Sequence, residues 1–410
     1  MKPYERLLYL VCLCCLLVLG GWSSTSAADL PSASVPTRVD NDANTRKGFD
    51  HFYNLEYDKS IHEFELAQQA HPDDPFAVNH TLAGVIFKEL LRIGALDTEA
   101  YAGDTFLTKQ AVAPVDPKVR ERVIQLTTQA LALSQAQLNK NPNDVDALYA
   151  RGATRALRAT YIGIVDKAWF AGLRGAVAAR HDEERVLELD PNYVDAKVVV
   201  GTHLYIMGSL SWPVKVAASV AGLSGSKQKG LDDLRQAAAG AHMETANDAK
   251  IVLALFLRRE QKYNEALRVV SGMQADFPRN FMMAAEYAHL MNAAGHGQAA
   301  IVAYRKVLVG CRGNAYSTCR MEVPAYGLGE ALRGQRDYAG AAEAYELAAS
   351  SGGHDAELRQ KSTLAAGEMY DLLQKRDTAL EKYKAVIAEN SATNSADLAR
   401  HYMKQAYKTP

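Results

Sequence analysis

The chain has 410 residues, of which 48% are apolar and 23% are charged, and its 46 basic and 47 acidic residues nearly cancel. This composition is close to ordinary globular usage and excludes a disordered or collagen-like chain, and the neutral balance argues against a general nucleic-acid binder, which needs a strongly basic face. At roughly 150 residues per domain, the length predicts two or three globular units or one long repeat array.

The first 28 residues have the pattern of a secretory signal peptide. Lys2 and Arg6 precede an uncharged apolar run from Leu7 to Leu19, and Ser26-Ala27-Ala28 is a small-residue cleavage site. The run is short for a membrane span, although an uncleaved anchor stays an alternative. Since no later segment is a comparably uncharged run of spanning length, we expect no membrane span after signal removal and a periplasmic or secreted protein.

Two cysteines remain after the predicted cleavage. Cys12, Cys14 and Cys15 lie within the signal peptide, which leaves Cys311 and Cys319. An even pair in an exported protein predicts a disulfide, and a loop this small would stabilise the fold by about 2.5 kcal/mol. The alternative is two free thiols if export fails. We expect no metal site here, because the two sulfurs have no further Cys or His at ligand spacing.

Residues 247–390 repeat a pattern of small and large positions with a period of 34, the spacing between Ala266 and Ala300. Small residues recur where the two helices of a pair approach closely, and large residues recur where one pair meets the next. These positions in four units are Ala254, Leu257, Ala266, Val270 and Met273; Ala288, Met291, Ala300, Tyr304 and Val307; Gly329, Leu332, Ala341, Tyr345 and Ala348; and Gly367, Tyr370, Ala379, Tyr383 and Val386.

The other regions are less regular. Residues 29–43 are rich in Ser, Pro and Asp and predict a flexible linker. Residues 44–246 show the same theme irregularly, with turns expected at 141–144 and 190–192. The enlarged turn that holds the two cysteines interrupts the regular array, so the disulfide would tie it off. Residues 391–410 are amphipathic and predict a capping helix, which repeat arrays need at their ends.

These positions resemble those of tetratricopeptide-repeat (TPR) proteins over nearly all of the chain after the signal peptide. More narrowly, residues 52–57, 71–75 and 201–205 resemble exported bacterial TPR proteins of unknown activity. There is also a remote likeness, based on export and helix pairs, to the periplasmic T-component of TRAP transporters. The resemblance implies an all-α fold, a solenoid of antiparallel helix pairs with two extended central hairpins.

Those two central extensions are apolar and carry aromatic residues. They run from Tyr161 to Phe170 and from Leu210 to Val220, and they include Trp169, Phe170 and Trp212. One interpretation is that they lengthen the helices and pack against each other, which is the commoner role of apolar runs. The other is that Trp169, Phe170 and Trp212 form the wall of a pocket for a ligand or partner.

Sequence patterns for catalysis are incomplete. Ser224 and Lys227 fit an S-x-x-K pattern, but the companion S-D-N and K-T-G motifs of penicillin-recognising enzymes are absent from the sequence. The 11 histidines show no metal-ligand spacing. We therefore expect no catalytic residues, no metal and no cofactor, so that the protein is not an enzyme.

The family resemblance instead implies a binding surface on the first helix of each pair. The residues at its ligand-contacting positions are Phe49, Phe52, Tyr53, Tyr149, Tyr205, Arg258, Arg259, Met282, His289, Asn292, Tyr326, Glu330 and Arg333. Aromatic and arginine side chains dominate binding hot spots, although several aromatics could equally be packing between repeats. Arg258, Arg259 and Arg333 are the stronger candidates for a partner-binding groove, because a core does not need them.

The sequence thus predicts an exported, non-enzymatic TPR scaffold that binds a protein or peptide in the cell envelope. The alternative is a ligand-binding accessory component of an envelope transport or assembly system, with the central extensions as its pocket.

Overall fold

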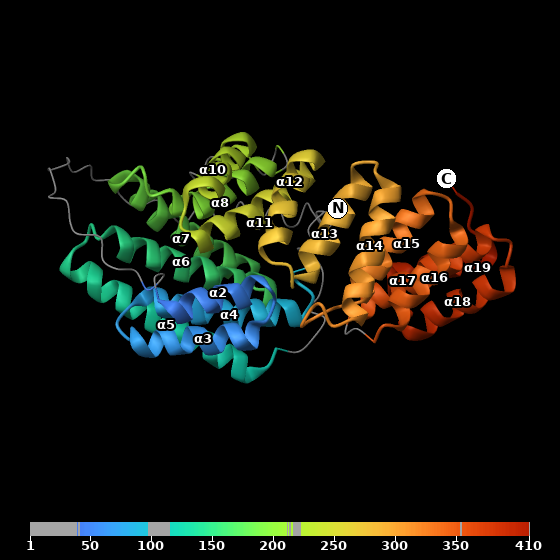
Figure 1. Cartoon of the computed structure of the whole chain (residues 1–410), viewed down its shortest axis with the longest axis horizontal. Coiled ribbons are helices and arrows are strands. Elements are labelled where there is room, and N and C mark those ends of the chain that lie inside the picture. The colour runs from blue at the N-terminus through green and yellow to red at the C-terminus, as the bar shows by residue number, and fades with distance from the viewer. Residues whose placement is uncertain are drawn as a thin grey trace. The chain divides into compact units, whose positions relative to one another are not determined.

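The computed structural model describes residues 39, 42–96, 115–210, 212, 215, 223–352 and 355–409. The predicted signal peptide and most of the predicted linker lie outside this part of the chain. Within it the secondary structure is helical and contains no strand, which confirms the all-α prediction (Figure 1).

The chain forms two compact units whose segments alternate along the sequence. The described residues of unit 1 fall within 39–47, 61–83 and 120–253. Those of unit 2 fall within 48–60, 84–119 and 254–409. Among the described helices, five have residues in both units: α2 (Ala43–Tyr53), α3 (Tyr57–Ala70), α4 (Pro75–Arg92), α5 (Pro117–Lys140) and α11 (Met243–Arg259). The predicted boundary at residues 246 and 247 stays a prediction.

Unit 1 is built largely from the long hairpins of the central region. Its elements are α5 (Pro117–Lys140), α6 (Val145–Thr160), the π-helical turn η4 (Tyr161–Val165), α7 (Trp169–Leu189), the 3-10 turn η5 (Val194–Ala196), α8 (Lys197–Ser209) and α10 (Lys227–Gly240). The predicted turn at 141–144 separates α5 from α6, where Asp144 caps α6 by accepting from the Ala147 backbone N–H at 3.0 Å.

The first central extension lengthens its hairpin. It continues α6 through η4, where Tyr161 and Val165 are buried, and then turns back into α7. Helices α6 and α7 approach at small residues, since a Cβ on Gly172 would lie 3.0 Å from the Gly163 Cα. Most of the second extension, residues 211, 213–214 and 216–220, lies outside the described residues.

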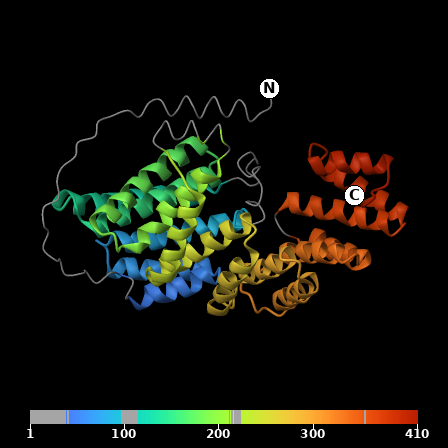
Figure 2. The ribbon, with the colours of Figure 1, turned by 90° about the horizontal axis from the view of Figure 1, so that it is seen from above.

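Unit 2 contains the regular array, in which the pairs succeed one another along the chain (Figure 1, Figure 2). Beyond the end of α11, its helices are α12 (Tyr263–Asp276), α13 (Phe281–Ala293), α14 (Gly297–Arg312), α15 (Glu322–Gly334), α16 (Tyr338–Ser350), α17 (Ala356–Leu372), α18 (Arg376–Glu389) and α19 (Asn394–Lys404). The first helices of successive pairs also contact each other, α13 with α15, α15 with α17 and α17 with α19.

The small and large positions of the repeat meet as the sequence predicts. A Cβ on Gly329 of α15 would lie 2.5 Å from the Tyr345 ring of α16, and one on Gly367 of α17 would lie 2.7 Å from the Tyr383 ring of α18. Tyr345 and Tyr383 are fully buried. The glycines therefore create the space that the two aromatic rings fill.

The turn between the helices of a pair has one backbone conformation throughout. The residue seven positions after the small residue has a positive φ in five hairpins, at Leu55, Gln261, Gly295, Arg336 and Gln374. In each hairpin two backbone hydrogen bonds close the helix end, as in Lys262 N to Leu257 O at 2.8 Å. This is the Schellman motif, in which glycine is usually favoured, yet four of these five residues carry a side chain.

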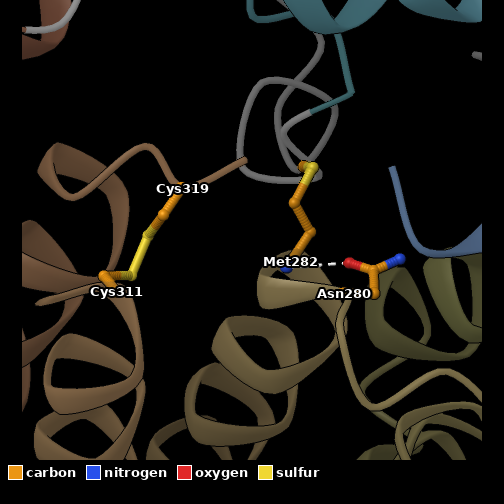
Figure 3. Close-up of a disulfide and its surroundings, with 4 residues drawn as sticks. All are labelled: Asn280, Met282, Cys311 and Cys319. Atoms are coloured by element: carbon orange, nitrogen blue, oxygen red, sulfur yellow. Dashed lines mark hydrogen bonds between the residues drawn. A yellow bond between two sulfur atoms is a disulfide. The ribbon is translucent and has the colours of Figure 1, made fainter. Parts of the chain in front are cut away.

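The cysteines are bonded to each other in unit 2, with Cα atoms 5.6 Å apart (Figure 3). The bond joins the end of α14 to the segment before α15. In the same view, Asn280 caps α13 by accepting from the Met282 backbone N–H at 2.9 Å.

Residues 48–60 pack against the start of α13, far along the sequence. Asn280 Nδ2 donates to Tyr53 O at 2.7 Å, and the Arg279 backbone N–H donates to Asn54 Oδ1 at 2.9 Å. The Tyr53 and Phe277 rings lie 5.0 Å apart. A linear array of neighbouring repeats does not predict this contact.

The predicted capping helix over 391–410 is shorter than expected. Helix α19 ends at Lys404, and Gln405 is extended, with φ −134° and ψ 117°. Arg376 terminates the helix by donating to the carbonyls of Tyr402 at 2.7 Å and Met403 at 2.9 Å, which satisfies groups that a continuing helix would bond. Residues 405–409 are therefore a non-helical tail.

Candidate partner-binding face

Helices α15 and α17 present charged and aromatic side chains on neighbouring faces. On α15 these are Tyr326, Glu330 and Arg333, whose spacings of four and three residues place them on one helical face. On α17 they are Lys361, Glu368 and Asp371, at spacings of seven and three. We call these six residues the Arg333 face.

Arg333 bridges the two helices. Its guanidinium lies 3.6 Å from Glu368 and 3.9 Å from Glu330, and its side chain remains 34% exposed. Desolvation lowers the pKa of Arg333, but the neighbouring Glu330 and the other groups around it outweigh this and raise the pKa above its usual value. The arginine is therefore a fixed cation that stays partly open to solvent.

Glu368 is the most perturbed carboxyl of this face. Burial raises its pKa to about 7, because desolvation outweighs the opposing effect of Arg333, and Glu330 and Asp371 raise it further. The charge of the face consequently changes near neutral pH.

Two buried tyrosines hold the other carboxylates in place. Tyr345 Oη donates to Glu330 at 2.6 Å, and Tyr383 Oη donates to Asp371 at 2.8 Å. Arg376 Nη1 also donates to both carboxylate oxygens of Asp371, at 2.8 and 2.9 Å. These contacts orient the face before any partner arrives.

Aromatic contacts complete the face on α15. The Lys361 ammonium lies 4.6 Å from the Tyr326 ring centre, within cation–π distance. The Tyr326 ring lies 5.4 Å from that of Tyr345.

The C-terminal tail lies on this face through Tyr407. Arg333 Nη2 donates to Tyr407 Oη at 2.8 Å, and the Tyr407 backbone N–H donates to Asp371 Oδ2 at 2.8 Å. The Tyr407 ring also meets the Tyr402 ring edge-on at 5.2 Å. A short extended peptide thus already contacts α15, α17 and α19.

Five of the predicted groove residues are buried packing residues instead, namely Phe49, Phe52, Tyr53, Arg258 and Tyr205. Arg258 is buried and pairs with Glu286 of the next first helix at 3.2 Å, so the premise that a core does not need an arginine is wrong at this position. Tyr205 is also buried, because α8 meets α10 there so closely that a Cβ on Gly230 would lie 2.8 Å from the Tyr205 Cβ. Neither side chain is available to a partner in this structure.

Tyr149, Arg259 and His289 are predicted groove residues that do not belong to the Arg333 face. Tyr149, in unit 1, is half-buried between Phe76 and Tyr193, with ring centres 5.9 and 5.2 Å away, and its hydroxyl lies 3.2 Å from the Thr245 hydroxyl. Arg259 and His289, in unit 2, are half-buried on α11 and α13. Of the predicted set, Tyr326, Glu330 and Arg333 lie together on the Arg333 face. Phe49, Phe52 and Tyr53 instead pack against one another, and the rings of Phe52 and Tyr53 lie 5.2 Å apart.

The predicted pocket of the central extensions stays a prediction. Phe170 is 36% exposed and Trp212 is 77% exposed. The side chain of Trp169 and most neighbours of Trp212 lie outside the described residues.

Sequence reasoning missed Lys361, Glu368, Asp371 and Tyr407. A usable signal existed for the first three, because they occupy the second, ninth and twelfth positions of the unit that contains Gly367, and these are ligand-contacting positions of the repeat. Tyr407 had no such signal, because it lies beyond the repeat units, in the stretch 391–410 that the sequence predicts to be a capping helix.

In the part of the chain that the structure describes, no cluster of three or more His, Cys, Asp or Glu side chains could hold a metal ion. None of the described helices combines the length and apolar character needed to cross a membrane.

No protein-family model matches the chain, and no curated protein matches it. Among solved structures, it is similar to that of PilF from Pseudomonas aeruginosa, with 17% identity and a TM-score of 0.39, over 64% of this chain and 99% of that one. A TPR protein from Parabacteroides merdae has 13% identity and a TM-score of 0.32, over 78% and 97% of the two chains. Human IFIT1, solved as a dimer with m7Gppp-AAAA, has 11% identity and a TM-score of 0.43, over 88% and 82%.

These likenesses are too distant to add to what the helix pairs show directly. The described chain is an all-α helical-repeat protein whose regular array is TPR-like in its pairing of helices and in its glycine–aromatic contacts.

Proposed function

We propose that the protein is an exported, non-enzymatic helical-repeat scaffold, and that it binds a protein or peptide partner of the cell envelope on the Arg333 face. The tail carries this proposal, because a stretch of extended peptide is already held there by a side-chain and a backbone hydrogen bond, each of 2.8 Å. The signal-peptide pattern of residues 1–28 supports the envelope location.

The chemistry of the face suits peptide recognition. Arginine and tyrosine are the residue types most often found at binding hot spots, and here they are oriented by buried partners. Charged groups that are partly exposed and already positioned lose little conformational freedom on binding.

The test is photocrosslinking in intact cells, with a photoreactive residue in place of the exposed Lys361. The matched control carries the same photoreactive residue at Val302, whose side chain is 61% exposed. Val302 lies on α14, the second helix of its pair. We expect capture of one identifiable envelope protein from position 361 and not from position 302. No capture from position 361, or equal capture from both positions, contradicts the proposal.

The second candidate is the accessory component of an envelope transport or assembly system, to which the remote likeness to the TRAP T-component belongs. The 77% exposure of Trp212 favours testing it. Labelling of a ligand from position 212, together with none from position 361, would support this alternative.

A further inference from the structure

The tail is recognised through features that many peptides share. Arg333 contacts a phenolic oxygen, and Asp371 contacts a backbone N–H, so only one side chain of the tail is read closely. The guanidinium carbon lies 5.8 Å from the Tyr407 ring centre and adds a cation–π contact. Any extended segment with a tyrosine could make these same three contacts.

The charges of the face nearly balance. Glu330, Glu368 and Asp371 supply three carboxyl groups, against the cationic groups of Lys361, Arg333 and Arg376. Residues 405–409 contain Lys408 and no acidic residue. Recognition of the tail therefore rests on the contacts of Tyr407 with Arg333 and Asp371 and not on net charge.

Several contacts that orient the face do not involve the tail. Asp371 still accepts hydrogen bonds from Arg376 and Tyr383, and Arg333 still lies beside Glu330 and Glu368. Lys408 and Thr409, just beyond Tyr407, are exposed. Departure of the tail therefore leaves a preorganised site, which is the condition for exchange with another peptide.

We propose that the tail, residues 405–409, is an intramolecular ligand of the Arg333 face, and that the partner is a peptide segment that presents a tyrosine in the same manner and displaces it. This inference rests on the proposed scaffold function and specifies both its partner class and its regulation. Binding of a partner is then a competition, in which the tail lowers the apparent affinity.

The test uses a fluorescent synthetic peptide with the sequence of residues 404–410. Its affinity is measured by anisotropy for the full chain, for a chain that ends at Lys404, and for the full chain with Tyr407→Ala. The second variant keeps the tail backbone and guards against a folding defect in the truncated chain, and helix content and the urea midpoint are compared for all three.

We expect the truncated chain and the Tyr407→Ala chain to bind the peptide at least about tenfold more tightly than the full chain, because the tail no longer competes for hydrogen bonds to charged groups. Adding Arg333→Ala to the truncated chain should reverse the gain, and a peptide with Tyr407→Ala should not bind. If the truncated chain does not bind the peptide, or binds it no better than the full chain, the inference is overturned.

The cellular crosslinking separates this inference from the scaffold function. Truncation at Lys404 should increase capture from position 361. Capture that truncation leaves unchanged overturns tail competition while the scaffold function stands, and loss of capture in both chains overturns both.

Discussion

Arg258 and Arg333 occupy the same position of the repeat and have different roles. Each lies four residues after the small residue of a first helix, and each pairs with a glutamate of the next first helix, at 3.2 Å for Glu286 and 3.6 Å for Glu368. The Arg258 side chain is 8% exposed and that of Arg333 is 34% exposed. Repeat position alone therefore does not distinguish a packing arginine from one that a peptide can reach.

The largest difference should come from removing each arginine. Arg258→Ala breaks the largely buried ion pair with Glu286 and should lower the free energy of unfolding by about 3–5 kcal/mol. Arg333→Ala should cost about 1 kcal/mol or less, since that pair is screened by solvent. Urea denaturation measures both. Equal losses would remove the distinction, and the double variant Arg258→Met with Glu286→Leu should recover most of the stability.

Glu368 should make the stability of the protein depend on pH. Because its folded pKa of about 7 is above its ordinary 4.5, protonation favours the fold, and stability falls as pH rises from about 4.5 to about 7. Glu368→Gln should remove this fall and stabilise the protein by as much as about 3 kcal/mol at pH 8, with little effect at pH 4. Urea midpoints across that range test this, with Glu381→Gln on the exposed side of α18 as control. A variant whose profile parallels that of the native chain would contradict it.

Gly329→Ala tests whether the glycine–tyrosine contact supports the Arg333 face. The new Cβ would lie 2.5 Å from the Tyr345 ring, so we expect a loss of about 1–3 kcal/mol from overpacking. Tyr345 would also shift from Glu330, which should weaken binding of the synthetic tail peptide. The control is Gly272→Ala in α12, where the added Cβ meets nothing within 4 Å and should stabilise the helix by about 1 kcal/mol or less. Similar losses in both variants would contradict this account.

The smallest effect should come from the turns between the helices of a pair, and it should be the same at Gln261 and Gln374. Gln261 and Gln374 have φ of 57° and 60° in equivalent turns, and glycine at either position should raise stability by about 0.5–1 kcal/mol. Gly295→Ala in the corresponding turn of α13 and α14 should cost a similar amount. Thermal melting of the three variants tests this, and opposite signs for the two glutamine positions would show that the turns are not equivalent.

The helix pairs could be predicted from the sequence because their packing depends on local spacing. The small residue and the aromatic that fills its space, such as Gly329 and Tyr345, recur at fixed separations. The turn conformation at Gln261 and Gln374 could not be read in this way, since neither residue is a usual marker of positive φ. The docking of residues 48–60 on α13 depends on contacts with no sequence period.

The Arg333 face was only partly predictable for a similar reason. Position in the repeat selected Tyr326, Glu330 and Arg333, and the same rule applied one unit further would have added Glu368 and Asp371. The rule also selected Arg258 and Tyr205, because burial depends on how closely the next helix approaches. The position of Tyr407 could not be predicted from a periodic pattern. It depends on the end of α19, which Arg376 sets through contacts between residues distant in sequence.

The contact between Tyr53-Asn54 and Arg279-Asn280 joins residues 225 to 227 positions apart. A ribosome releases the chain from its N-terminus, so the Tyr53 ring and the amide of Asn54 exist long before the residues that cover them. Unit 2 can therefore complete its folding only after most of the chain has been synthesised.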